Sequence, residues 1–122
     1  MPSFNEKQPI FQQVSEMIEN DILKNLYQEG DQIISTTQIA KTFQINPATA
    51  VKGINLLVDQ DILFKKRGVG MFVKTGAREK ILTKRRKEFY EDFIIRLLDE
   101  AKKLELSNED IVALIMKESG EH

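Results

Sequence analysis

The chain has 122 residues, enough for one domain or for a small domain with an appendage, and for a modest hydrophobic core. It contains no cysteine, which excludes disulfides and thiolate metal sites, and no apolar run approaches the roughly 18 residues of a membrane span. We therefore expect a cytoplasmic protein without a membrane segment. The formal net charge of the whole chain, −1, does not by itself point to any class of binding partner.

The first predicted element is an amphipathic helix that begins after Pro9. Apolar residues recur at helical spacing from Ile10 to Leu26, and we expect this helix to cover the back of the segment that follows. A turn is predicted at Gly30-Asp31. The β-prone run Gln32-Ile33-Ile34 then predicts a short third strand for the sheet described below.

Two short helices that meet at a tight turn are predicted between Ser35 and Gln60. Ser35 and Gln38 have the spacing of a capping box, in which each side chain satisfies an otherwise free backbone N–H. Asn46 is a good N-cap for the second helix, and Pro47 suits its first position. The predicted buried stripe of this helix is Ala50, Gly53, Ile54 and Leu57. Its outer face carries short, polar and cationic side chains that permit close approach to a groove: Ala48, Thr49, Lys52 and Asn55.

The period then changes from helical to extended, which predicts a two-stranded hairpin with the tip Gly68-Val69-Gly70. The β-prone runs are Ile62-Leu63-Phe64 and Met71-Phe72-Val73, and three cations, Lys65, Lys66 and Arg67, precede the tip. Such a cation run is also common at a solvated strand end. Helix, turn, helix and hairpin form the arrangement of a winged helix-turn-helix, whose second helix enters the major groove of DNA.

Positive charge is concentrated in the middle of the chain. Residues 41–87 contain twelve Lys or Arg and three acids, giving +9, whereas residues 1–40 sum to −4 and residues 88–122 to −6. Because salt screens phosphate attraction beyond about 8 to 10 Å, the regional charge is the relevant one. The basic middle therefore favours an acidic partner such as DNA.

One long helix is predicted from Ala77 to Glu105, with an apolar stripe formed by Leu82, Phe89, Phe93, Leu97, Ala101 and Leu104. The helix is too long to lie wholly on a domain of this size, so we expect part of its apolar face to meet a second copy. Its first turns carry Lys84-Arg85-Arg86-Lys87, either a solubilising face or a phosphate contact beside the hairpin. A second helix is predicted after its N-cap Ser107, ending near Gly120.

Five groups of residues occur in order across residues 9–73: Pro9-Ile10-Phe11-x-Gln13-Val14, Gly30-Asp31-x-Ile33, Ser35-x-x-x-Ile39-Ala40, Asn46-Pro47-x-Thr49 and Gly68-x-Gly70-x-Phe72-Val73. The ordered set resembles the N-terminal domain of GntR-family bacterial transcription regulators. The Asn-Pro pair and the short C-terminal part are similar to the YtrA-like subfamily. The resemblance implies a mainly α fold with a small β-sheet. It also implies a winged helix-turn-helix domain over residues 1–76 and a two-helix dimerisation appendage over residues 77–122.

The resemblance also implies where DNA is contacted: at the start of the first short helix, along the second, and at the hairpin. The expected DNA-binding residues are Ser35, Thr36, Thr37, Asn46, Pro47, Ala48, Thr49, Lys52, Asn55, Lys65, Lys66, Arg67, Gly68, Val69 and Gly70. The stripe from Leu82 to Leu104 is the expected dimerisation surface.

Several positions depart from the family's usual residues. The family usually has an arginine at the position of Thr37 and commonly one at or beside Lys52. The hairpin tip usually has a cation and a threonine where this chain has Val69 and Met71. Other members often carry arginine at two further positions, those of Pro47 and Val51. We therefore expect the fold and the role to hold while the base-reading residues differ.

These observations predict a homodimeric transcription regulator, with repression as the expected activity, that binds double-stranded DNA at an inverted-repeat operator. The alternative is a winged-helix module for protein association, with the basic middle serving an acidic partner. No catalytic residue, cofactor or metal site is predicted, because phosphate-binding loops, nucleophile–histidine pairs and metal-ligand spacings are absent, and the one histidine is the last residue, His122. The effector, if one exists, is not identified by the sequence; we expect it between subunits or between the two domains.

Overall fold

The computed structural model describes residues 4–120. Met1–Ser3 and Glu121–His122 lie outside the described residues, and so does the expectation that His122 is not a ligand. The chain divides into two compact units, Met1–Thr83 and Lys84–His122, which are described separately. Within the described range, no helix is both long enough and apolar enough to cross a membrane.

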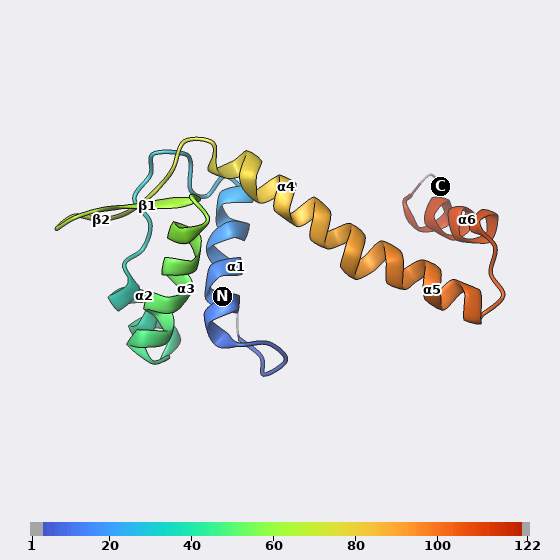
Figure 1. Ribbon diagram of the computed structural model, residues 1–122, viewed down its shortest axis with the longest axis horizontal. Coiled ribbons are helices and arrows are strands. Elements are labelled where there is room, and N and C mark those ends of the chain that lie inside the picture. The colour runs from blue at the N-terminus through green and yellow to red at the C-terminus, as the bar shows by residue number, and fades with distance from the viewer. Residues whose placement is uncertain (1–3, 121–122) are drawn as a thin grey trace. The chain divides into compact units, whose positions relative to one another are not determined.

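The first unit combines three helices and the first turns of a fourth with a two-stranded antiparallel sheet (Figure 1). Its elements are α1 (Ile10–Leu23), α2 (Thr36–Phe43), α3 (Pro47–Asp59), β1 (Leu63–Lys66) and β2 (Gly70–Val73). Both α1 and α2 pack against α3, and the strand register pairs Leu63 with Val73 and Lys66 with Gly70. The predicted fold class, a mainly α winged helix-turn-helix with a small sheet, is confirmed.

The core of this unit lies between α1, α3 and the base of the hairpin. It contains Val14, Ile18, Ile22, Ile39, Ala50, Ile54, Leu57, Ile62, Leu63 and Val73, all 4% exposed or less, together with Ala77 and Ile81 from the start of α4 (Ala77–Phe89). All four residues of the stripe predicted for α3 are buried. Because one face of α3 is buried in this core, its opposite face is left to contact solvent or a binding partner.

Three details of this unit differ from the predictions. Gln38 does not complete a capping box with Ser35: its side-chain amide donates to Thr42 Oγ1 at 2.8 Å, and only the Ser35 half, Oγ accepting from Gln38 N–H at 3.0 Å, is formed. The predicted third strand is reduced to one bridge between Gln32 and Phe72. Finally, α1 ends at Leu23, and Leu26 is 68% exposed, so its assignment to the buried stripe is wrong.

The early end of α1 has a local cause. Asn25 adopts φ 64°, and the N–H of Leu26 donates to the carbonyl of Asp21 at 2.8 Å. This is a left-handed helix cap of the Schellman type, usually built on glycine but here on another residue. Equivalent caps end α2, α3 and α5, at Gln44, Asp61 and Glu105.

The second unit is helical. After the end of α4, a π-helical turn η1 (Tyr90–Ile94) leads into α5 (Ile95–Lys103), and α6 (Asn108–Glu118) follows. The long helix predicted from Ala77 to Glu105 is therefore present but contains a π-helical turn. At the start of α6, Ser107 and Asp110 form a complete capping box, confirming the predicted N-cap.

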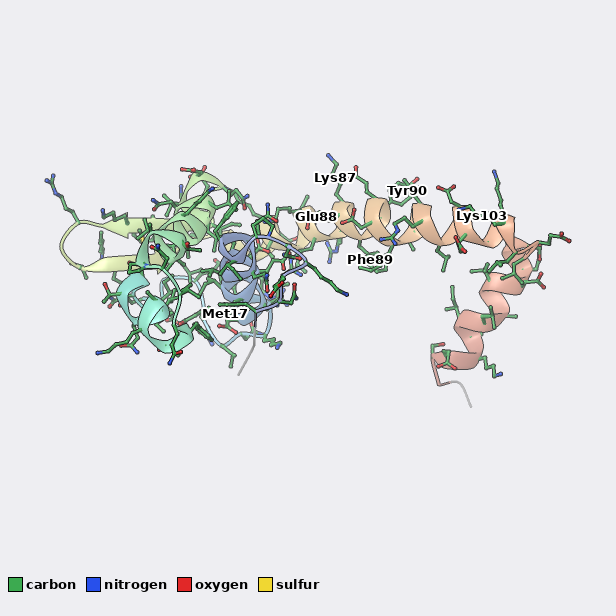
Figure 2. The ribbon with its side chains drawn as sticks, turned by 90° about the horizontal axis from the view of Figure 1, so that it is seen from below. Met17, Lys87, Glu88, Phe89, Tyr90 and Lys103 are labelled. Carbon is green, nitrogen blue, oxygen red and sulfur yellow. The ribbon has the colours of Figure 1, made fainter. Side chains whose placement is uncertain are left out.

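Large apolar side chains of the second unit are mostly uncovered. Of its described residues only Ala101 and Ile111 are buried. Of the expected dimerisation residues, Phe89, Phe93, Leu97 and Leu104 are between 42% and 61% exposed, and Leu82, which belongs to the first unit, is half-buried. Figure 2 shows Phe89 and Lys87 extending from opposite sides of the helix. One side of this helix is thus apolar and open.

Candidate nucleic-acid interface

The helix α3 is positioned by its cap and by its buried face. Asn46 Oδ1 accepts a hydrogen bond from the N–H of Ala48 at 2.8 Å, and Pro47 occupies the first turn, as predicted. The carbonyl of Gly53 accepts a hydrogen bond from the buried Ser15 hydroxyl of α1. These contacts fix which side of α3 faces outward.

A hollow of about 260 Å³ lies between α3, the start of α2 and the hairpin, and we call it the wing groove. Its lining residues are Ser35, Thr36, Val51, Asn55, Lys65, Gly70 and Met71. Three separate elements thus present side chains to one concave surface. Hydroxyl, amide and ammonium groups on such a surface can hydrogen-bond to phosphates and base edges.

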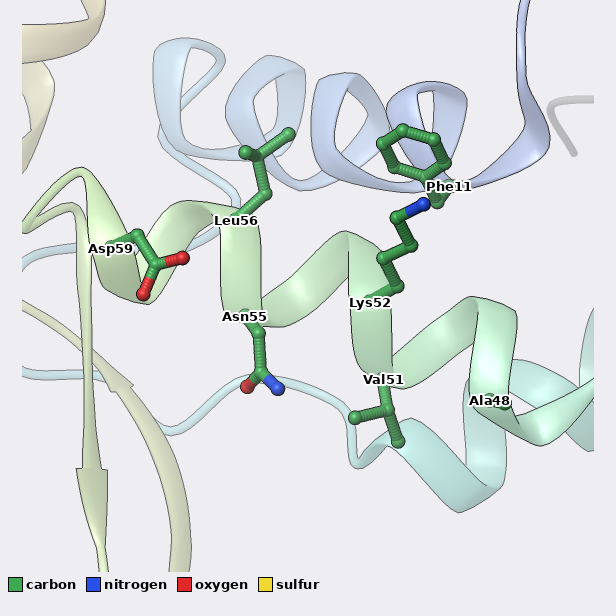
Figure 3. Close-up of a pocket in the computed structure, with 7 residues that line it drawn as sticks. All are labelled: Phe11, Ala48, Val51, Lys52, Asn55, Leu56 and Asp59. Atoms are coloured by element: carbon green, nitrogen blue, oxygen red, sulfur yellow. The ribbon is translucent and has the colours of Figure 1, made fainter.

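A second hollow, of about 400 Å³, lies on the α1 side of α3 (Figure 3). Phe11, Ala48, Lys52, Leu56 and Asp59 line it, together with Val51 and Asn55, which also line the wing groove. Lys52 extends toward α1, and its Nζ lies 4.0 Å from the centroid of the Phe11 ring, a cation–π contact. Lys52 is therefore directed away from the wing groove, although it was predicted to share a DNA-binding face with Asn55.

The three hairpin cations do not form one patch, because alternate residues of a strand point to opposite faces. Lys65 pairs with Met71 and lines the wing groove. Lys66 lies on the other face, with Nζ 4.9 Å from the Phe72 ring centroid, and the Phe72 ring stacks on Phe64 at 5.7 Å. Arg67 is exposed at the turn.

The hairpin tip is held by Gln32, which precedes α2. Its side-chain amide donates to the carbonyl of Val69 at 2.9 Å. Gly70 has φ 146°, a conformation that favours glycine, and a Cβ built there would lie 2.5 Å from Gln32 Nε2. Gly68 has φ 76° and forms the turn in which Val69 N–H donates to the carbonyl of Lys66 at 2.9 Å.

Two other lysines near the hairpin are paired. Asp61 accepts a hydrogen bond from Lys74 Nζ at 3.2 Å and lies 3.9 Å from Lys80 Nζ. The hydrogen bond from Lys74 and the positive charges of both lysines lower the pKa of Asp61. Within residues 4–120, no ion pair involves the hairpin cations Lys65 to Arg67, so their charge remains available to a partner.

The structure gathers five of the predicted DNA-binding residues on the wing groove: Ser35, Thr36, Asn55, Lys65 and Gly70. The remaining ones lie outside its lining: Thr37, Asn46, Pro47, Ala48, Thr49, Lys52, Lys66, Arg67, Gly68 and Val69. Two lining residues, Val51 and Met71, were missing from the predicted set. Val51 had a usable signal, since it is an apolar residue outside the buried stripe of α3 and is 41% exposed. Among the described residues, no group of three or more His, Asp or Glu side chains could hold a metal ion.

Comparison with known proteins identifies the same part of the chain. Residues 10–73 match the family described as bacterial regulatory proteins, gntR family. An uncharacterized HTH-type transcriptional regulator, YydK of Bacillus subtilis (strain 168), is 29% identical over 69 residues, which are 57% of this chain. The chain spans only 29% of that relative's length.

Two solved structures resemble the chain over most of its length. A GntR family transcriptional regulator from Listeria monocytogenes has a TM-score of 0.79 at 27% identity and covers 93% of this chain and 98% of its own. YtrA from Sulfolobus acidocaldarius, a GntR-family transcription factor, has a TM-score of 0.57 at 22% identity. The match covers 96% of this chain and 94% of YtrA, and it shows a shared fold. All three relatives are described as transcription regulators and not as enzymes.

Proposed function

This chain belongs to the gntR family of bacterial regulatory proteins, and we propose that it acts as a homodimeric repressor on an inverted-repeat DNA operator. In this proposal residues 1–76 bind DNA and residues 77–122 hold two copies together. The observation that carries it is the wing groove, where α2, α3 and the hairpin meet beside Lys65, which forms no ion pair with any residue that the structure describes. This is the arrangement expected of a helix-turn-helix with a DNA-contacting wing.

In the proposed complex α3 enters the major groove and the hairpin lies against the backbone or the minor groove. The backbone N–H groups at the start of α2, beside Ser35 and Thr36, face a phosphate. Thr37 and Arg67, which belong to the predicted set but lie outside the wing groove, reach phosphates at its margin. Base edges are then contacted only by residues on the outer face of α3.

The dimer proposal rests on the uncovered apolar side of the second unit. Phe93 is 61% exposed, and its ring lies 5.4 Å from that of Phe89, centroid to centroid. Exposed apolar patches of this kind on a soluble protein mark interaction sites. The proposed partner is a second copy of the chain, because an inverted repeat is bound by two linked copies, one on each half-site.

Fluorescence anisotropy titrations against a random duplex at two salt concentrations test DNA binding most simply. We expect affinity to fall steeply as salt rises, because each phosphate contact releases counterions. Absence of binding at the lower salt concentration, with tight association with an acidic protein, would instead support a protein-association module.

Replacing Lys65 with alanine is expected to weaken binding to specific and random duplexes alike and to reduce the salt slope by about 1. Lys66→Ala is the matched control, since Lys66 points to the other face of the hairpin and contacts Phe72; its salt slope should change less. The measurement is the titration above, repeated over several salt concentrations. Equal slope changes for both variants would contradict the assignment of one hairpin face to DNA. Loss of specific binding alone in Lys65→Ala would indicate that this lysine reads bases.

A further inference from the structure

The outer face of α3 presents two uncharged side chains, Val51 and Asn55, to the wing groove. We propose that these two residues make the chain select A·T base pairs in each half-site: Asn55 binds an adenine, and Val51 contacts the methyl group of a thymine. Lys52, the only cation on α3, takes no part in base reading. This inference rests on the proposed operator binding and adds the base identity to it.

The two side chains are suitably placed for this role. They are four residues apart, one turn of helix, which corresponds to about 6 Å along the axis of α3. Base pairs stack at about 3.4 Å, so the two side chains span roughly two base-pair steps. Figure 3 shows both directed away from α1, whereas Lys52 and Leu56 point toward it.

The chemistry of each side chain selects a different base. The Asn55 amide offers an NH2 donor group and a carbonyl acceptor on a short stem, which match the N7 acceptor and the N6 donor of adenine. Guanine offers two acceptors in the major groove and leaves the amide oxygen without a partner. Val51 has no polar atom, and the only apolar group in the major groove is the thymine methyl. Covering that methyl also removes from water an apolar side chain that is 41% exposed.

The one side chain of α3 that could bind guanine, Lys52, is held outside the wing groove. A lysine on the outer face of α3 would contact guanine O6 and N7, but the Lys52 ammonium lies 4.0 Å over the Phe11 ring. Moving it into the wing groove would give up this cation–π contact. The cation that does line the groove, Lys65, comes from β1 and not from α3. The reading face of α3 is therefore neutral.

The test begins with a pool of duplexes carrying 20 random base pairs, from which those that bind the chain are enriched. We expect enriched half-sites to contain an adenine and a thymine within two base-pair steps of each other. In the selected duplex, 7-deazaadenine removes N7 and uracil removes the thymine methyl. We expect about a 5-fold loss of wild-type affinity for the first substitution and about a 4-fold loss for the second. Asn55→Ala should be insensitive to 7-deazaadenine, and Val51→Ala to uracil.

Lys52→Ala is the matched control, because it removes the one cation of α3, which is next to Val51 in the sequence but points toward α1 and not into the wing groove. It should enrich the same half-site as the wild-type chain. The base analogues also test the inference with wild-type protein alone, so it stays testable if a variant misfolds. Failure to enrich any sequence would contradict the proposed function itself. Two results would overturn the inference and leave the regulator role intact. One is enrichment of G·C pairs in the half-sites that is lost in Lys52→Ala. The other is a wild-type affinity that neither base analogue changes.

Discussion

Replacing Phe93 and Leu97 with aspartate is expected to give a monomer that has lost operator affinity by about 10²- to 10⁴-fold. Both side chains lie on the open apolar side of the second unit, and two charges there would have to be desolvated in any interface. In a dimer the second half-site contact is effectively intramolecular, and linkage of this kind commonly adds about 10² to 10⁴ in avidity. Sedimentation velocity measures the oligomer, and anisotropy titrations on full and single half-site duplexes measure the affinity.

Lys102→Glu is the matched control. It changes the net charge by the same amount as the double substitution, and Lys102 lies five residues beyond Leu97 on α5, about 140° around the helix. This variant should remain dimeric and bind the full operator. The double variant should bind a single half-site as weakly as the wild-type chain does. A double variant that still sediments as a dimer would show that the second unit dimerises through other residues or not at all.

Substituting Gly53 with alanine is expected to lower the free energy of unfolding of the first unit by about 1 to 3 kcal/mol. A Cβ at this position would lie 2.6 Å from the carbonyl oxygen of Phe11 and 2.9 Å from Val14 Cβ. Because the first of these is a backbone atom of α1, the two helices must separate to accept it. Helix propensity alone predicts the opposite sign, a gain of about 1 kcal/mol for alanine over glycine.

Asn55→Ala separates these two effects, since Asn55 is exposed on the same helix and alanine there adds no close contact. It should leave the stability unchanged or raise it slightly. Urea unfolding followed by circular dichroism provides both values. A Gly53→Ala chain as stable as the wild type would contradict the close approach of α1 and α3, and with it the fixed orientation of the α3 outer face.

Helix starts could be predicted from the sequence, whereas the end of α1 could not. Ser35, Asn46 and Ser107 cap their helices as predicted, because a short oxygen-bearing side chain before an apolar run is a local signal. The end of α1 relies on a left-handed residue that is not glycine, Asn25, and no local pattern identifies it. This is why α1 was predicted to be longer than it is.

Within the site, local chemistry was predictable and the direction of side chains was not. The run Lys65-Lys66-Arg67 appears in sequence as a single basic patch, yet the pleat of β1 separates Lys65 from Lys66. Lys52 was expected on the outer face because it lies off the buried stripe of α3, but a ring from another helix attracts it. That contact joins residues far apart in the sequence, so no helical pattern could reveal it.

The number of chains bound to one selected inverted-repeat duplex tests the proposed homodimeric regulator most directly. Sedimentation equilibrium of the full-length chain with that duplex should give two chains per duplex. Scrambling one half-site should reduce the affinity by about 10²- to 10⁴-fold. A single chain per duplex, or equal affinity for the intact and the half-scrambled duplexes, would contradict the proposal.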